Sequence, residues 1–118
     1  MNEIKLFISQ PMSNHTAEEV LSTRMNIVRK FIGTYPDTPF KVLDNYFSVN
    51  PEFEKMNVPN LAYFGLSLTV MAQADVVLFS KDFTTSDGCR IEHALAYNNK
   101  MKVIYEDQLN NYESATED

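Results

Sequence analysis

The chain has 118 residues, of which 44% are hydrophobic and 22% charged, which is the size and composition of a single globular domain. Its formal net charge of -6 argues against a nucleic-acid polymer as partner, because that binding relies on basic side chains that neutralise phosphates. No membrane-spanning run or signal peptide is recognisable, and only one cysteine and two histidines are present, so we expect a cytoplasmic protein without membrane partner, metal or cofactor.

The first half of the chain predicts a strand, a helix and a second short strand. Residues 5–9 are short and apolar and predict a buried strand. The capping-box pattern of residues 16–19 opens a helix that ends at the stop signal Gly33. Its apolar residues at helical spacing are Leu21, Met25, Val28 and Ile32. A loop with two prolines leads to a strand at 40–43, and residues 44–60 look irregular.

The second half predicts two helices and two strands in alternation. A helix capped by Asn60 runs to about Ala74, and its apolar face comprises Leu61, Phe64, Leu68 and Met71. The later elements are a buried strand at 75–80, a polar loop at 81–87, a helix at 88–97 and a strand at 101–105. We expect an α/β domain over residues 1–106 and an acidic tail over residues 107–118.

Strands that alternate with helices predict a parallel sheet with right-handed crossovers. We therefore expect the α/β class, with one parallel sheet of about four or five strands and flanking helices, as in flavodoxin-like or Rossmann-like folds. Ligands of such sheets bind beyond the carboxyl ends of the strands, which directs attention to the loops at 10–15, 44–60 and 81–87. Asp75 opens its strand and lies at the opposite edge, so we expect a structural role for it.

The glycine-rich signatures of common phosphate-binding folds are missing. The chain has three glycines and contains neither the dinucleotide-binding pattern nor a P-loop. A receiver-type phosphoacceptor site is not supported either, because Ser9, Gln10 and Ser80 stand where it needs acidic residues.

The segment at 84–96 joins a buried strand to a helix and holds the candidate chemistry. Gly88 lets the backbone come close to a ligand, and Ser86 with the first N–H groups of the helix forms a site for a phosphate or carboxylate. Ile91 and Leu95 are expected to face the sheet, which leaves the neighbouring Glu92 half buried at the border of that face.

Each of these residues also has a simpler explanation. Glu92 can complement the dipole of its helix, and Ser86 or Asp87 can serve as a plain N-cap. Cys89 is interpreted as a small apolar contact, since no partner base is identifiable. His93 is expected at the surface or half buried on its helix, and His15 in an exposed loop.

Four segments of the chain resemble the nucleoside 2-deoxyribosyltransferase-like superfamily, including its small branch common in phage and bacterial genomes. They are KLFISQPMS at 5–13, ADVVLF at 74–79, SDGCRIEHALA at 86–96 and KVIYE at 102–106. Together they cover most of residues 4–106. The segment at 86–96 carries the pattern D-G-x-x-x-E-x-x-x-A in a strand-loop-helix context.

The resemblance implies that Glu92 is a nucleophile that attacks C1′ of a (deoxy)ribosyl group and displaces the base. Such cleavage passes through an oxocarbenium-like transition state, which a nearby carboxylate stabilises and traps. Related deoxynucleoside 5′-monophosphate N-hydrolases hold phosphate with a serine six residues before the nucleophile, where this chain has Ser86. The other half of the implied phosphate cradle is the loop of Ser9, Gln10, Pro11, Met12 and Ser13.

Two positions depart from the family pattern. Phe7 stands where the family often has a tyrosine that orients the nucleophile, and Ser67 stands where it has a base-contacting aspartate. With less help for the leaving base, slow turnover or binding without chemistry is a further expectation. Enzymes of the family are homo-oligomers whose neighbours complete the site, and we expect the same here.

The expected function is cleavage of the N-glycosidic bond, by hydrolysis or base transfer, in a (deoxy)nucleoside 5′-monophosphate or nucleoside. Glu92 is the expected nucleophile, and Asp87 contacts the sugar hydroxyl or the base proton. Ser86 and Gly88 hold phosphate, and Tyr46 or Tyr63 stacks on the base. The alternatives are a non-catalytic protein that binds a nucleotide or nucleotide-like ligand, and a structural or interaction protein. Residues 1–105 hold ten basic and eleven acidic side chains, so this nearly neutral body does not repel an anionic mononucleotide.

Overall fold

The structure is a computed structural model and describes residues 3–109 of the chain. Its elements are, in order, β1 (Ile4–Ser9), α1 (Ala17–Thr34), β2 (Phe40–Val42), α2 (Pro51–Glu54), α3 (Pro59–Met71), β3 (Val76–Phe79), η1 (Phe83–Thr85), α4 (Asp87–Asn98), β4 (Lys102–Tyr105) and η2 (Glu106–Gln108). Within residues 3–109, no helix combines the length and the apolar character needed to cross a bilayer.

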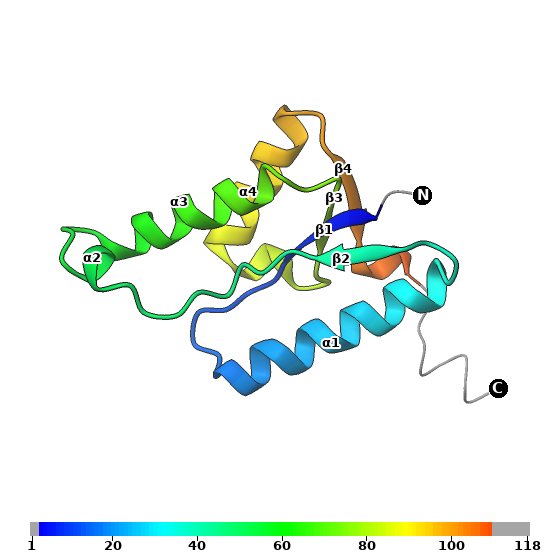
Figure 1. The fold of residues 1–118 in the computed structure, drawn as a ribbon, viewed down its shortest axis with the longest axis horizontal. Helices are drawn as coiled ribbons and strands as arrows, with labels where there is room; N and C mark the ends of the chain where they lie inside the picture. The colour runs from blue at the N-terminus through cyan, green and yellow to red at the C-terminus, as the bar shows by residue number, and fades with distance from the viewer. Residues whose placement is uncertain (1–2, 110–118) are drawn as a thin grey trace.

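The strands form one parallel sheet in the order β2-β1-β3-β4. The register aligns Leu6 of β1 with Val42 of β2 and Val76 of β3, and Phe79 of β3 with Tyr105 of β4. Helix α1 covers one face of the sheet, and α3 and α4 lie on the other (Figure 1). This confirms the prediction of a single α/β domain with a flavodoxin-like or Rossmann-like parallel sheet.

Alternating side chains of the central strands divide the core into two clusters, one on each face of the sheet. On the α1 face, the fully buried residues are Leu6, Ile8, Ile27, Phe31 and Leu78. On the α3 and α4 face the buried residues are Phe7, Met71, Val77, Phe79 and Ala96. Phe7 is therefore a core residue, and Ser9 follows it on the same face at the carboxyl end of β1.

Helix α1 begins as predicted but buries a different stripe. Thr16 Oγ1 accepts the backbone N–H of Glu19 at 3.1 Å, and Glu19 Oε1 accepts that of Thr16 at 2.8 Å, which is a complete capping box. The buried stripe is Val20, Arg24, Ile27 and Phe31. Of the four residues that predicted the helix, Leu21, Met25 and Ile32 are exposed, and Val28 is partly buried against the core. Helix α1 thus has two stripes with helical spacing, and the stripe that faces the sheet includes the charged residue Arg24. Gly33 lies inside the helix, which runs on to Thr34.

The segment between β2 and α3 is more regular than predicted. Residues 44–60 contain the one-turn helix α2, which Asn50 caps by accepting the backbone N–H groups of Glu52 and Phe53. The prediction that Asn60 caps the following helix is wrong. Pro59 opens α3, because its missing N–H costs nothing in the first turn, and Val58 is the N-cap without a side-chain bond.

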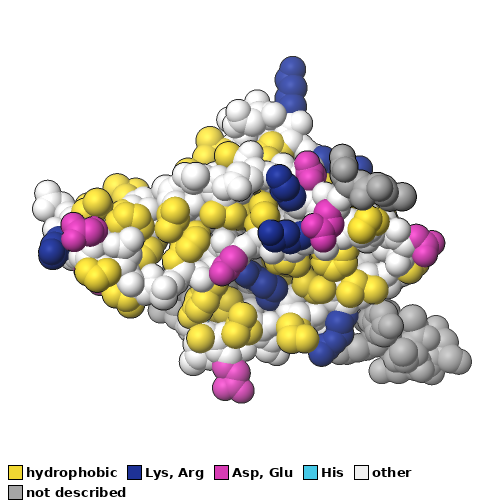
Figure 2. Space-filling view, viewed as in Figure 1, with side chains coloured by type: hydrophobic (Ala, Val, Ile, Leu, Met, Phe, Trp, Pro, Cys, Tyr) yellow, Lys and Arg dark blue, Asp and Glu magenta, His cyan; other side chains and the backbone are white. Residues whose placement is uncertain are grey.

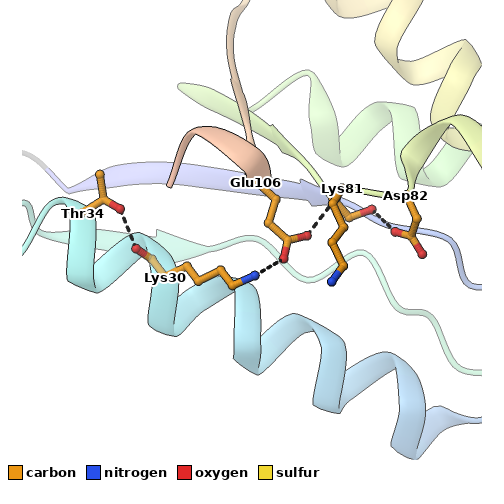
Figure 3. Close-up of polar contacts among 6 residues, drawn as sticks. Lys30, Thr34, Lys81, Asp82 and Glu106 are labelled. Atoms are coloured by element: carbon orange, nitrogen blue, oxygen red, sulfur yellow. Dashed lines mark hydrogen bonds and ion pairs between the residues drawn. The ribbon is translucent and has the colours of Figure 1, made fainter. Parts of the chain in front are cut away.

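The C-terminal end of the described chain packs against the domain. Glu106 is buried, and its carboxylate lies 2.7 Å from Lys30 Nζ and accepts the backbone N–H of Lys81 at 2.8 Å (Figure 3). Leu109 belongs to the core cluster on the α1 face. Packed structure therefore continues to Leu109, and the rest of the expected acidic tail, residues 110–118, lies outside the described residues.

Candidate functional site

A pocket of about 540 Å³ opens at the carboxyl edge of the sheet, between β1, α3 and α4. All three loops that the topology singled out contribute to it, together with α3 and α4. Its polar lining consists of Gln10, Ser13, Asn45, Asn60, Tyr63, Ser67, Ser86, Asp87 and Glu92. Its apolar lining includes Met12, Phe47, Val58, Leu61, Phe64, Cys89 and Ile91.

Glu92 lies at the bottom of this pocket and is held by two serine hydroxyls. Ser9 Oγ donates to one carboxylate oxygen at 2.7 Å, and Ser67 Oγ donates to the other at 3.0 Å. The side chain of Glu92 is 6% exposed. Three elements, β1, α3 and α4, thus converge on one carboxylate.

The burial of Glu92 corrects the predicted orientation of α4. The buried face of the helix is Cys89, Glu92 and Ala96, at the spacing i, i+3 and i+7. Glu92 therefore stands in the middle of that face and not at its border. Ile91, which was expected to face the sheet, is 49% exposed and lines the pocket.

The hydroxyl that holds Glu92 comes from a different position than the resemblance implied. Phe7 is enclosed in the core, and Ser9, two residues further along β1 on the same face, reaches the carboxylate. Ser67, interpreted as the loss of an aspartate, supplies the second hydroxyl. Ser9 was expected to contact a ligand, and no pattern in the sequence predicted that either serine binds Glu92.

Burial and hydrogen bonding act on the ionisation of Glu92 in opposite directions. Removal from water raises the pKa of the Glu92 carboxyl, while the hydroxyls of Ser9 and Ser67 lower it, and the net result lies above the ordinary value. Burial likewise raises the pKa of the neighbouring Cys89 thiol, which agrees with its interpretation as a small buried contact.

The start of α4 forms the wall of the pocket next to Glu92. Ser86 is the N-cap of the helix and accepts the backbone N–H of Cys89 at 3.3 Å. The carboxylate of Asp87 is exposed and pairs with the side chain of Arg90, one helical turn away. Gly88 faces the ring of Phe64, which lies 3.5 Å from where a β-carbon on Gly88 would stand.

The two tyrosines proposed for base stacking lie in different places. Tyr63 lines the pocket, and its hydroxyl donates to Glu54 at 2.8 Å and accepts the backbone N–H of Asn50 at 2.9 Å. Tyr46 does not line the pocket, and its backbone N–H donates to Asp44. Phe47 and Phe64 are the other aromatic rings of the pocket wall, and the sequence predicted neither of them for the site.

The expected phosphate loop after β1 contributes in part. Gln10, Met12 and Ser13 line the pocket, whereas Pro11 does not, and Ser9 lies behind the wall against Glu92.

Gln10 belongs to a buried network that the sequence did not reveal. Arg24 donates from Nε to Gln10 Oε1 at 2.8 Å and from Nη2 to Asn45 Oδ1 at 2.5 Å. Burial lowers the pKa of the Arg24 guanidinium, and the nearby charge of Asp44 opposes this effect. Hydrogen bonds from the buried Arg24 guanidinium thus hold the side chains of Gln10 and Asn45, which form a polar wall of the pocket.

The remaining candidate residues lie away from the pocket. His15 is on an exposed loop 3.8 Å from Glu19, and the half-buried His93 lies 2.6 Å from the Tyr105 hydroxyl. Asp75 accepts the backbone N–H of Lys5 at 2.8 Å at the opposite edge of the sheet, which is a structural contact. Between residues 3 and 109, no cluster of three or more acidic, histidine or cysteine side chains could hold a metal ion.

A known family matches more than half of the chain. Residues 43–105, slightly more than half of the chain, match the family described as "Domain of unknown function (DUF4406)". The match includes Ser67, Ser86 and Glu92 but not Ser9 or Arg24. Neither a curated protein nor a solved structure matches the chain significantly.

Proposed function

We propose that the chain, which belongs to the DUF4406 family, cleaves the N-glycosidic bond of a (deoxy)nucleoside 5′-monophosphate or nucleoside, with Glu92 as nucleophile. The observation that carries the proposal is the buried carboxylate of Glu92 at the bottom of the pocket, oriented by Ser9 and Ser67. The resemblance to the nucleoside 2-deoxyribosyltransferase-like superfamily supports the same assignment.

The geometry suits a carboxylate that must face developing positive charge on a sugar. Each oxygen of Glu92 accepts one serine hydroxyl, which fixes the plane of the carboxylate and leaves lone pairs for the ligand. An oriented anion at the floor of a pocket stabilises an oxocarbenium-like transition state more strongly than one in water does.

The proposed reaction has two steps. In the first, a carboxylate oxygen of Glu92 forms a bond to C1′ while the bond from C1′ to the base nitrogen breaks, and the base leaves with that electron pair and takes up a proton from solvent. In the second, water or an acceptor base attacks C1′ and loses a proton to solvent, the ester to Glu92 breaks, and the carboxylate is restored. Hydrolysis and base transfer differ only in this acceptor.

The walls of the pocket offer contacts for the rest of a nucleotide. Ser86 and the N-terminal turn at Gly88 form one side of the proposed phosphate cradle, and the loop of Gln10, Met12 and Ser13 forms the other. Asp87 lies at the same end of the helix, within the pocket lining, where it can contact the sugar or the base. The aromatic wall for the base consists of Phe47, Tyr63 and Phe64.

A specific observation also favours binding without cleavage. Because burial raises the pKa of Glu92, a larger share of this residue is protonated than of an ordinary glutamate at the same pH. A protonated carboxyl donates a hydrogen bond but is a poor nucleophile. The same pocket would then hold a nucleotide or nucleotide-like ligand without turnover.

We further propose that the protein is a homo-oligomer. Large apolar side chains are exposed around α2 and α3, among them Val49, Met56, Val58 and Leu61. Figure 2 shows hydrophobic side chains gathered over this end of the molecule. A second copy packed there would cover this surface and border the pocket, because Val58 and Leu61 also line it.

Incubation of the protein with deoxynucleosides, their 5′-monophosphates and nicotinamide dinucleotide, followed by chromatography for released base, tests the proposed activity. Multiple-turnover release from the nucleosides or monophosphates supports glycosidic cleavage. Thermal stabilisation by the same compounds without product supports the binding protein instead. The absence of both stabilisation and product would refute both functions, and a structural or interaction role would then remain.

A further inference from the structure

Arg24 is a buried cation behind the pocket that the proposed reaction does not use. It lies on the inner stripe of α1 and is 9% exposed. Its two side-chain partners, Gln10 and Asn45, are neutral amides, and both line the pocket. Within the described part of the chain Arg24 forms no ion pair, and Asp44 is the acidic residue whose charge acts on it.

Arg24 fixes which atoms of these amides are donors. Because the guanidinium takes the amide oxygens, the Gln10 nitrogen donates to the Val20 carbonyl and the Asn45 nitrogen to the Ile8 carbonyl, each at 3.0 Å. A side-chain amide nitrogen carries two hydrogens. Among residues 3–109 no acceptor engages the second hydrogen of either amide, and hydrogen bonding of their oxygens to a cation polarises both groups as donors.

The charges around the pocket favour an anion at the wall of Gln10 and Asn45, which adjoins one side of the proposed phosphate cradle. Glu92 and Asp87 both line the pocket and repel a negative group, although Asp87 is paired with Arg90. The charge of Asp44 offsets the effect of burial on the Arg24 guanidinium only in part, and a negative group on a ligand at the wall would add to this offset.

We propose that Arg24 is a specificity-determining residue: through the amides of Gln10 and Asn45 it makes the pocket prefer a ligand with an anionic group at this wall over the neutral analogue. The proposal rests on the proposed function in that the ligands compared are nucleotides and nucleosides. Because it concerns binding, it is tested in a variant that lacks the proposed nucleophile and therefore releases no base.

The test compares Arg24→Gln with Arg29→Gln, a control on the exposed side of the same helix. In the Glu92→Gln background, calorimetry measures the affinities of each deoxynucleoside and its 5′-monophosphate. With Arg24 present, we expect at least one monophosphate to bind about tenfold or more tightly than its nucleoside. Arg24→Gln should abolish most of this preference, and Arg29→Gln should retain it.

An unchanged preference in a folded Arg24→Gln variant would overturn the proposal, as would the absence of any preference with Arg24 in place. If Arg24→Gln does not fold, Asn45→Asp provides the test, because a carboxylate there gives Arg24 an internal counter-charge. The preference should then fall with Arg24 still present, and its retention refutes the proposal. Failure of the proposed function is distinguishable, since it appears as selective binding by the unaltered chain without base release.

Discussion

Removal of the Ser67 hydroxyl should make Glu92 harder to ionise. Ser67→Ala deletes a 3.0 Å hydrogen bond to a carboxylate that burial already disfavours, while Ser9 at 2.7 Å remains. Hydrogen bonds to charged groups contribute about 1.5–3 kcal/mol, and the half-buried position of Ser67 favours the lower end of that range. About 1.5 kcal/mol corresponds to roughly a tenfold smaller ionisation constant. The pKa of Glu92 therefore rises further in this variant.

A ¹³C NMR titration of the glutamate carboxyl carbons measures the effect, with the Glu92 signal assigned by its loss in Glu92→Gln. Ser80→Ala is the matched control, because Ser80 is also a buried serine at the end of a central strand but donates to Asp82. The titration of Glu92 should move to higher pH in Ser67→Ala and stay in place in Ser80→Ala. Equal titration curves in both variants would refute the claim that Ser67 stabilises the ionised form.

Three further predictions concern stability, measured by urea denaturation. Thr16→Ala should lower the free energy of unfolding by about 1 kcal/mol through loss of the capping box with Glu19, and a change within error would contradict that role. Glu106→Ala should cost about 3 kcal/mol, because Lys30 then loses its buried partner, and Glu52→Ala at the exposed Glu52–Lys55 pair is the control expected to cost little. Because the folded-state pKa of Glu92 is raised, the stability that its protonated form contributes is present at acid pH and is lost as the pH rises through that pKa. Glu92→Gln should therefore raise the free energy of unfolding at pH 7 by about 0.5–2 kcal/mol. A lower free energy of unfolding at pH 7 would contradict this reasoning.

The sequence predicted the sheet well because its central strands, β1 and β3, are buried on both faces. A continuous apolar run such as Val76 to Phe79 predicts a buried strand without any need to decide which face is buried. The helices between the strands require parallel pairing. Helix faces were harder to predict. On α1, an outer stripe with Leu21 and Met25 has the same spacing as the inner one, and only tertiary packing shows that the stripe with Arg24 is buried.

The pocket was predictable in position but not in its internal contacts. Topology alone indicates that loops after β1, β2 and β3 meet at one edge, and the segment at 84–96 indicates α4 as one wall. The contacts of Ser9 and Ser67 with Glu92 join residues 83 and 25 positions apart. No local spacing rule spans such separations, and the polar network of Arg24 was hidden for the same reason.

The central claim, that Glu92 acts as the nucleophile in glycosidic cleavage, is tested most directly by the rate of base release from deoxynucleoside 5′-monophosphates in Glu92→Gln. The substitution keeps the shape of the side chain and removes the carboxylate. With Ser80→Ala as a control that retains activity, we predict a loss of at least about a thousandfold in kcat for Glu92→Gln, because the covalent step needs an anionic oxygen. Base release within a fewfold of the unaltered protein would contradict the mechanism.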